Sequence, residues 1–535
     1  MNALLSISNL SVCYGEKLAV DGISLDIHAG EAVGVIGESG SGKSMTALSI
    51  LGLLPQEAKM SGRILYRGQD LASLDENGLR ALRGRRISMV FQDPMNSLNP
   101  LMTVGAQMVE AVRAHAAVTV PEARSCAHEL LEEVGLPQPY TQLDRYPFEL
   151  SGGQQQRVMI AMALASKPEL LIADEPTTAL DVTTQAQVLA LLRRIQRGRG
   201  MAMLFVSHDL HAVNGLVDRV AVMQKGKVLE CGSTDQVMQR PTHPYTQSLV
   251  AANKPVMAGR RPSSRQVTGL AIALDSVCLE YRSAKMGQPP HRVVHDVSVQ
   301  LREGAALGIV GESGSGKSTL ARAVMGMLSP AAGSVRVLGM DPADHRQRRK
   351  FASHCQFVFQ DTTGSLNPRR TIAQTLAEPQ QIHAPDTAAN MARRSAVLME
   401  EVGLEPALLT RYPHQLSGGQ RQRIVIARAL ATNPRILVCD EPVSALDATV
   451  RTQVLALIAR LRQERNLTLV FIGHDLTVME SVAEETMVLK KGRVVEYGAT
   501  QQIFSAPKHV YTQSLMAFGR WGDRDEFADP KYGAN

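Results

Sequence analysis

The stretch that decides the fold reads Gly37-Glu-Ser-Gly-Ser-Gly-Lys-Ser44, and the same sequence recurs at Gly311–Ser318. Each copy follows a short apolar run, Ala32–Ile36 in the first case, and precedes a stretch with helical character. Glycines let the backbone N–H groups of such a loop approach a phosphate closely, and the positive end of the following helix attracts the same anion. In this context the motif predicts a loop that binds nucleotide phosphates, twice in one chain.

The last two side chains of each loop predict its ligands. Lys43 and Lys317 can reach the terminal phosphates, and Ser44 and Ser318 can coordinate Mg²⁺. A chance glycine-rich turn is the alternative, and two copies in matched contexts argue against it.

An acidic pair follows a later apolar strand in each copy. Asp174-Glu175 comes directly after Leu170–Ala173, and Asp440-Glu441 repeats the arrangement with the same proline behind it. The aspartates are predicted to hold Mg²⁺, directly or through water, and the glutamates to orient or deprotonate the attacking water. Such pairs are often only solvated, but here the strand, the spacing and the proline all repeat.

The repeated motifs mark an internal duplication. The loop lysines are 274 positions apart, the glutamines of two Phe-Gln-Asp segments 268, and all later motifs 266. Insertions are therefore confined to the first part of each copy. We predict two domains, at residues 1–250 and 270–535, joined by a short flexible linker at residues 251–269 that contains proline, glycine and arginine.

The apolar pattern predicts an α/β fold for each domain. Ala32–Ile36, Leu170–Ala173 and Met203–Val206 are short apolar runs between polar turns, which is typical of strands buried on both faces of a mainly parallel sheet. Gln154–Ala165 and Thr184–Ile195 have helical periodicity. Alternating strands and helices indicate a layered α/β domain, present twice.

Composition limits the function classes. The 535 residues are 44% apolar and 20% charged with a net charge of +6, which excludes a disordered chain and gives no support for a nucleic-acid partner. The basic clusters at 83–86 and 346–350 are predicted to be solvated surface; anionic lipid headgroups or an acidic partner are the alternative. There is no apolar run long enough to span a bilayer, no secretory signal and no metal spacing among the six cysteines, which are predicted to be reduced. We expect a cytoplasmic protein whose membrane role, if any, needs a spanning partner.

Together these motifs resemble an ABC-type ATPase with two nucleotide-binding domains in tandem, over nearly the whole chain. The family signature Leu-Ser-Gly-Gly-Gln stands at Leu150–Gln154 and Leu416–Gln420. The resemblance implies two P-loop NTPase domains, each with a RecA-like parallel-sheet core, an antiparallel β subdomain and a helical subdomain carrying the signature. It also implies that two ATP molecules are sandwiched between head-to-tail domains, each signature facing the phosphate loop of the opposite domain.

The resemblance assigns roles to further residues. Gln92 and Gln360 would contact Mg²⁺ or the attacking water and sense the transport subunits, while His208 and His474 would contact the γ-phosphate and hold the water and the glutamate. Asp181 and Asp447 would communicate across the dimer, and an aromatic residue in each half would stack on adenine. The predicted catalytic residues are Glu175, Glu441, His208 and His474; the predicted ATP-binding set is Tyr14, Gly37, Ser39, Gly40, Gly42, Lys43, Ser44, Met45, Gln92, Ser151, Gly152, Gly153, Gln154, Tyr281, Gly311, Ser313, Gly314, Gly316, Lys317, Ser318, Thr319, Gln360, Ser417, Gly418, Gly419 and Gln420; and the predicted Mg²⁺ ligands are Ser44, Gln92, Asp174, Ser318, Gln360 and Asp440.

Both halves retain every member of this set. The halves differ at two equivalent positions: Met45 corresponds to Thr319, and Ser207 corresponds to Gly473. Neither position has a named chemical role. We therefore expect two sites that both hydrolyse ATP.

Two further repeats indicate what the ATPase drives. Ser97–Pro100 and Ser365–Pro368 follow the glutamines, and His243–Leu249 is echoed by His509–Leu515 with Val510 in place of proline. Both elements resemble the ATPases of the bacterial oligopeptide/dipeptide/nickel importer family, including its double-length members. Ordinary loop packing preserved through the duplication is the alternative.

The resemblance implies an ATP-hydrolysing subunit that energises a bacterial importer of short peptides, bound peripherally at the cytoplasmic face of the inner membrane. Its partners would be two permease subunits and an extracytoplasmic solute-binding protein. Nickel chelates, opines and glutathione remain open as solutes, and an exporter fits the core motifs but not the tail elements. A soluble tandem ATPase acting on ribosomes is a further alternative. It is disfavoured because the two domains of such proteins are joined by a long charged helical linker, whereas the linker predicted here is short and rich in proline and glycine.

Overall fold

The structure is a computed structural model, and it describes residues 3–92, 97–178, 180–252, 269–281, 290–444, 446–474 and 476–519. The chain divides into two compact units, the first ending before residue 254 and the second ending at Gly519. Residues 251 and 252 end helix α11 (Pro244–Ala252), and the rest of the predicted linker up to residue 268 lies outside the described residues.

A six-stranded sheet forms the centre of the first unit, in the order β10-β9-β3-β8-β7-β6. All neighbours are parallel except β10, which is antiparallel to β9. Because Ile36 pairs with Ser207 and Asp174 with Val206, the carboxyl ends of β3, β7 and β8 meet at one edge. The strands are β3 (Ala32–Ile36), β6 (Ile87–Val90), β7 (Leu170–Asp174), β8 (Ala202–Ser207), β9 (Arg219–Gln224) and β10 (Lys227–Ser233).

The two faces of this sheet pack against different layers. On β3, Val33 and Val35 join a core with the antiparallel sheet and helix α1, whereas Ala32 and Ile36 join the core of the helical part. The antiparallel sheet has the order β2-β1-β4-β5. Its strands are β1 (Leu5–Tyr14), β2 (Lys17–Ile27), β4 (Ala58–Tyr66) and β5 (Gln69–Asp70); the helices are α1 (Lys43–Ile50), α2 (Glu76–Leu82), α4 (Val104–Arg113), α5 (Val120–Glu133), α6 (Pro139–Leu143), α7 (Gly152–Leu164), α8 (Val182–Arg199), α9 (Leu210–Val213), α10 (Thr234–Gln239) and α11.

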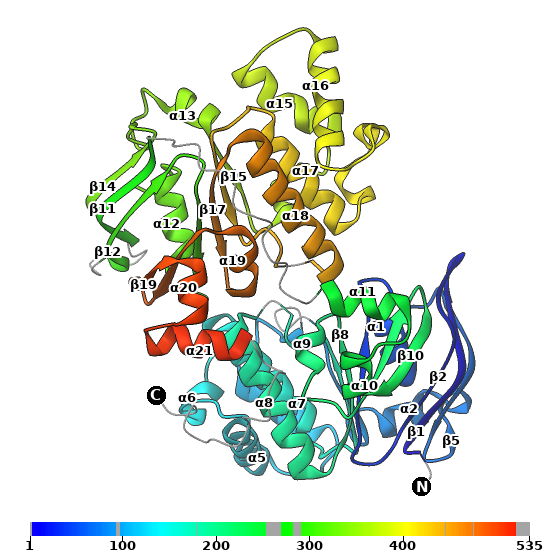
Figure 1. The fold of residues 1–535 in the computed structure, drawn as a ribbon. Helices are drawn as coiled ribbons and strands as arrows, with labels where there is room; N and C mark the ends of the chain where they lie inside the picture. Colours follow the sequence, from blue (N-terminus) through cyan, green and yellow to red (C-terminus); the bar gives the residue numbers. More distant parts are fainter. Residues whose placement is uncertain are drawn as a thin grey trace. The chain divides into compact units, whose positions relative to one another are not determined.

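The second unit repeats this plan with a six-stranded sheet in the order β15-β16-β17-β13-β18-β19 and a three-stranded sheet in the order β12-β11-β14. Figure 1 shows α17 and α18 together beside the strands of the larger sheet. The strands are β11 (Leu270–Tyr281), β12 (His291–Arg302), β13 (Ala306–Val310), β14 (Ala332–Val337), β15 (Cys355–Val358), β16 (Ile436–Asp440), β17 (Thr468–Gly473), β18 (Glu485–Lys490) and β19 (Arg493–Ala499); the helices are α12 (Lys317–Val324), α13 (Arg348–His354), α14 (Thr362–Ser365), α15 (Ile372–His383), α16 (Ala388–Glu401), α17 (Gly418–Leu430), α18 (Ala448–Arg465), α19 (Leu476–Val482), α20 (Thr500–Ser505) and α21 (Val510–Gly519).

The α/β prediction is confirmed, with differences at helix ends. Helices α7 and α8 each begin two residues before the predicted start, because Ser151 and Asp181 cap their first turns ahead of the apolar pattern. All six cysteines lie in the described part of the chain, and none of them is paired in a disulfide. Within the described residues, none of the helices combines the length and the apolar character needed to cross a bilayer.

Candidate functional site

The phosphate loop of the first unit runs from the end of β3 into α1, and backbone packing explains two of its glycines. A Cβ on Gly37 would lie 2.1 Å from the carbonyl oxygen of Met223, and one on Gly42 would lie 2.4 Å from that of Ala19. Gly42 also has a φ of 102°, which favours glycine. The tip of the loop, Ser39-Gly40, is exposed, so its N–H groups are open to a ligand.

Each loop encloses its lysine. The ammonium of Lys43, only 4% exposed, donates to the carbonyl oxygens of Gly37 at 2.7 Å and Glu38 at 2.8 Å. Lys317 makes the matching bonds to Gly311 and Glu312 at 2.7 and 2.8 Å. The buried ammonium thus lies inside the loop, where its charge would attract the phosphates of a nucleotide.

The serine at the start of each helix meets the aspartate at the end of a distant strand. Ser44 Oγ lies 3.1 Å from Asp174 Oδ1, and Ser318 Oγ lies 3.0 Å from Asp440 Oδ1. Burial raises the pKa of Asp174 to about 6, with the neighbouring Glu175 adding to the effect, and burial likewise raises the pKa of Asp440. Hydroxyl and carboxylate oxygens are ligands that Mg²⁺ prefers, and a buried carboxylate with a raised pKa is one that a cation would stabilise.

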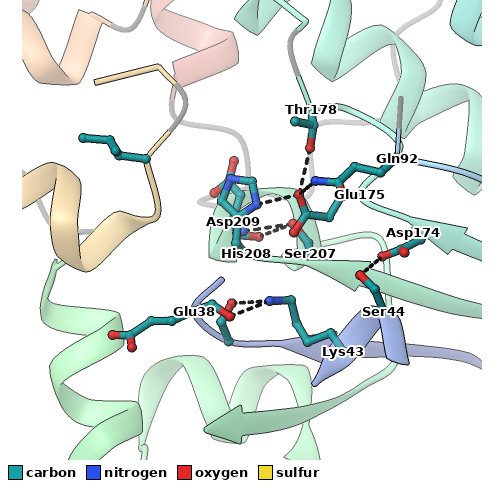
Figure 2. Close-up of polar contacts among 12 residues, drawn as sticks. Glu38, Lys43, Ser44, Gln92, Asp174, Glu175, Thr178, Ser207, His208 and Asp209 are labelled. Atoms are coloured by element: carbon teal, nitrogen blue, oxygen red, sulfur yellow. Dashed lines mark hydrogen bonds and ion pairs between the residues drawn. The ribbon is translucent and has the colours of Figure 1, made fainter. Parts of the chain in front are cut away.

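Three side chains from different segments converge on Glu175 (Figure 2). Its Oε2 accepts from Gln92 Nε2 at 2.9 Å and Thr178 Oγ1 at 3.0 Å, and His208 Nδ1 lies 3.0 Å away. Burial opposes the charged form, but the hydrogen bond and charge of His208, with Lys43, outweigh it, so the pKa of Glu175 lies below its ordinary value. The carboxylate is therefore ionised at neutral pH and able to accept a proton or orient a water.

Glu175 also has a backbone conformation that few residues adopt. Its φ is 45°, and its N–H donates to the carbonyl oxygen of Val206 on β8 at 2.9 Å. Glu441 repeats this with a φ of 46° and a bond to Ile472 at 3.0 Å. Left-handed conformations in non-glycine residues cost about 1–3 kcal/mol and cluster at functional sites.

Two side chains of the described residues contact the glutamate of the second unit. Gln360 Nε2 donates to Glu441 Oε2 at 3.0 Å, and His474 Nδ1 lies 3.3 Å from the same oxygen. The balance of burial against His474 and Lys317 again places the pKa of Glu441 below its ordinary value. Ser444, the counterpart of Thr178, donates instead to the main-chain oxygen of Glu441.

Thr178 is a residue of the site that sequence reasoning missed. A signal was available, because a hydroxyl residue stands three positions after the glutamate in both halves. Ser207 is a second case: its Oγ accepts from the N–H of Asp209 at 2.9 Å and so shapes the turn that carries His208. The second half has Gly473 at this position and lacks that hydroxyl.

The signature segments begin helices α7 and α17. Ser151 and Gln154 form a capping box, in which Ser151 Oγ accepts from the Gln154 N–H at 3.4 Å and Gln154 Oε1 accepts from the Ser151 N–H at 3.0 Å. Ser417 and Gln420 do the same at 3.3 and 3.0 Å. Ser151 is exposed, so the start of this helix remains accessible to an anion.

The second signature glycine has a packing role within its own unit. A Cβ on Gly153 would lie 2.3 Å from Thr184 Cγ2, and one on Gly419 would lie 2.4 Å from Val450 Cγ1. Helices α7 and α8 therefore approach each other too closely there for any larger residue. This packing requires glycine at the position whether or not a phosphate binds there.

The aspartates predicted to communicate across a dimer are helix caps in the structure. Asp181 accepts from the N–H of Thr184 at 3.0 Å and from its hydroxyl at 2.9 Å, and Asp447 accepts from the N–H of Val450 at 2.9 Å. Their predicted role between the halves stays a prediction.

The aromatic residues predicted to stack on adenine lie at strand ends. Tyr14 is 48% and Tyr281 37% exposed, so both side chains are partly open to solvent. Tyr281 Oη lies 3.4 Å from Thr319 Oγ1, which links the second tyrosine to the helix after the phosphate loop. Met45, the counterpart of Thr319, instead packs on the core of the first unit.

The fold and the site together define a class of protein. In each unit the structure joins a phosphate loop, a serine–aspartate pair and a glutamate supported by glutamine and histidine, all at the carboxyl edge of one parallel sheet. This arrangement is that of a P-loop nucleoside triphosphatase, present twice in the chain.

Comparison with known families identifies the class more closely. The family described as ABC transporter matches residues 20–178 and 294–444, more than half of the chain. The region described as oligopeptide/dipeptide transporter, C-terminal region, matches residues 229–274 and 495–518. The chain belongs to the ABC transporter family, and it is an ATP-binding protein whose ATPase activity is coupled to transport. The fold and enzyme class predicted from the sequence are confirmed.

Curated relatives align with both halves of this chain and over most of their own length. The peptidoglycan transport ATP-binding protein YejF of Agrobacterium fabrum is 45% identical over 96% of both chains. The glutathione import ATP-binding protein GsiA of Salmonella paratyphi A is 40% identical over 96% of this chain and 89% of its own, and the ABC transporter ATP-binding protein YejF of Escherichia coli is 43% identical over 96% and 99%.

Proposed function

We propose that this chain is the ATP-hydrolysing subunit of a bacterial importer for short peptides. The observation that carries the proposal is the C-terminal region of oligopeptide and dipeptide transporters, which matches in both halves, after β9 and after β18. A soluble ATPase acting on ribosomes would not need that region, so its presence favours the importer over the ribosomal alternative.

The substrate class follows from what the relatives have in common. The names of two relatives give peptidoglycan and glutathione as the molecules transported, and both contain short peptides. A peptide or a peptide-containing molecule is therefore the solute we propose. Nickel chelates and opines have no support among these relatives.

We propose that Mg²⁺ binds with ATP at Ser44 and Asp174, and at Ser318 and Asp440. The serine and aspartate oxygens already lie 3.0–3.1 Å apart, and burial disfavours the bare aspartate charge, so the pair fits a cation. The Mg²⁺ would neutralise phosphate charge that develops during cleavage. Gln92 donates through Nε2 to Glu175, which leaves its amide oxygen as the ligand it would offer.

The same geometry supports a division of labour around the γ-phosphate. Lys43 would leave the carbonyl oxygens of its loop to bind the terminal phosphates. Glu175, ionised and fixed by its partners, would orient the attacking water and accept its proton. His208 would keep the carboxylate in place and contact the phosphate. Glu441, Lys317 and His474 would act in the same way in the second site.

We further propose that the two sites are shared between the halves, as the family resemblance implies, with each signature completing the phosphate loop of the other half. Membrane permease partners follow from membership of the transporter family. Two permease subunits, an extracytoplasmic solute-binding protein and a peripheral position at the inner face of the membrane complete the proposal.

Copurification tests this function. Tagged chain would be isolated from a detergent extract of its own cells, and the bound proteins and nucleic acids identified. We expect two polytopic permeases, and an ATPase rate that rises when the permeases are reconstituted with a binding protein loaded with peptide. Copurified ribosomal RNA without permeases would refute the importer and support the ribosomal alternative.

A further inference from the structure

The C-terminal element of the first unit is tied to the edge of the sheet by a carboxylate. Glu230 on β10 accepts from the N–H and the hydroxyl of Thr242, both at 2.8 Å, and from the N–H of His243 at 3.1 Å. His243 Nδ1 in turn accepts from the N–H of Tyr245 at 3.1 Å. These bonds fix the first turn of α11 and with it the direction of the Tyr245 side chain.

That side chain reaches the phosphate loop. The N–H of Glu38, the second residue of the loop, donates to Tyr245 Oη at 3.4 Å, across 207 positions of sequence. The carbonyl oxygen of the same residue accepts from Lys43 Nζ at 2.8 Å (Figure 2). Both main-chain polar groups of Glu38 are therefore bonded, one by the C-terminal element and one by the lysine that would bind phosphate.

The second unit repeats the connection. Glu496 on β19 accepts from the N–H groups of Lys508 at 2.9 Å and His509 at 3.1 Å, and His509 Nδ1 accepts from the N–H of Tyr511. Tyr511 Oη accepts from the N–H of Glu312 at 2.9 Å. The main-chain bonds and the link from tyrosine to loop recur, while the Thr242 hydroxyl bond has no counterpart at Lys508.

One difference separates the two units. The ammonium of Lys490 lies 4.7 Å from the centre of the Tyr511 ring, a cation–π contact, whereas Gln224 stands at the equivalent position in the first unit. Tyr511 is buried at 5% exposure, and its hydrogen bond to the loop is the shorter of the two. The second loop is thus held more firmly than the first.

We propose that Tyr245 and Tyr511 are positioning residues of the two ATP sites, through which the C-terminal element holds each phosphate loop in its binding conformation. The inference rests on the proposed function, because it assumes that these loops bind ATP. When Lys43 leaves the carbonyl oxygens of Gly37 and Glu38 for the phosphates, Tyr245 still holds the N–H of the Gly37–Glu38 peptide and so keeps this part of the loop oriented. The glycine-rich loop is then already ordered before ATP binds, so less conformational entropy is lost on binding.

The test compares Tyr245→Phe and Tyr511→Phe in the full chain with Tyr66→Phe as the matched control. Tyr66 is a buried tyrosine of β4 whose hydroxyl donates to Glu169 at 2.7 Å, and Glu169 precedes β7 at the end of that strand opposite Asp174. Titration calorimetry with Mg²⁺ and a non-hydrolysable ATP analogue should show one of the two sites weakened by about two- to tenfold in each loop variant, the effect of one lost hydrogen bond. Tyr511→Phe should have the larger effect, and Tyr66→Phe should bind as the wild type does.

Amide hydrogen exchange without nucleotide provides an independent readout. The peptide containing Glu38 should exchange faster in Tyr245→Phe, and the one containing Glu312 faster in Tyr511→Phe, with both unchanged in Tyr66→Phe. Unaltered affinity and exchange in both folded variants would overturn the proposal, as would an equal loss of affinity in Tyr66→Phe. If the wild-type chain bound no analogue, the proposed function would fail, and the exchange rates would still decide whether the tyrosines hold the loops. Should one variant not fold, the other unit supplies the same test.

Discussion

Gly153→Ala tests whether the second glycine of the signature is required by packing or by the nucleotide. The added methyl group would lie 2.3 Å from Thr184 Cγ2. Thr184 cannot simply turn away, because its hydroxyl is bonded to Asp181 at 2.9 Å and its N–H to the same carboxylate. The methyl group therefore forces either helices α7 and α8 apart or the threonine out of its hydrogen bond.

The expected magnitude is set by two opposing effects. Alanine is preferred over glycine in a helix by about 0.5–1 kcal/mol, so local propensity alone predicts a gain in stability. Overpacking a tight contact costs about 1–3 kcal/mol. The two ranges combine to a net loss of about 0–2.5 kcal/mol, centred near 1 kcal/mol. For a unit of this size the central value lowers the Tm by a few degrees, at about 2–4 °C per kcal/mol.

The assay is thermal unfolding of the full chain, with Gly153→Ala combined with Thr184→Ser as the rescue. Serine lacks the methyl group that clashes but keeps the hydroxyl that bonds Asp181. We expect the double variant to regain the lost stability. If its ATPase rate stays low, the glycine also serves close approach to the nucleotide. A Gly153→Ala variant more stable than the wild type, or a loss that Thr184→Ser does not reverse, would refute the packing argument. Gly419→Ala with Val450→Ala repeats the test in the second unit.

Three further predictions concern catalysis and stability. Glu175→Gln with Glu441→Gln should lower phosphate release by about 10²–10⁴-fold, the usual worth of a general base, while calorimetry still detects analogue binding because the amide keeps an acceptor oxygen; lost binding would instead indicate a structural role. If the sites are shared between the halves, the ATPase rate of Glu175→Gln with Ser417→Arg should equal that of its slower single variant, because both changes fall in one site. The rate of Glu175→Gln with Ser151→Arg should fall well below that of either single variant, because both sites are damaged. The reverse ranking would show that each half closes on its own nucleotide. Glu230→Gln should lower the Tm at pH 7. Because the pKa of Glu230 is lowered from 4.5 to about 2, its carboxylate stabilises the fold fully above about pH 4.5 and loses this effect as the pH falls towards 2. The Tm values of wild type and variant should therefore converge near pH 2, and a constant difference would contradict the stabilising role of the carboxylate.

The local parts of the site were predictable from the sequence. The phosphate loop, its lysine and serine, the acidic pair and the capped signature are each contained in a few consecutive residues, and their geometry is set by glycine, helix capping and strand periodicity. The duplication made these predictions stronger, because two copies must satisfy the same physics. The strands predicted around Ala32–Ile36 and Leu170–Ala173 agree with β3 and β7 for the same reason.

Contacts between distant segments were decided only by the tertiary structure. Gln92 and Glu175 are 83 positions apart, and Tyr245 and Glu38 are 207 apart, yet each pair is hydrogen-bonded. Gln92 meets Glu175 because β6 and β7 are parallel neighbours in the sheet, and Tyr245 reaches Glu38 because the sheet places β3 beside β9, from which it is distant along the chain. Periodicity reveals that a strand is buried but not which strand lies beside it, so these bonds, and the left-handed turn at Glu175, follow from strand order and not from any local pattern.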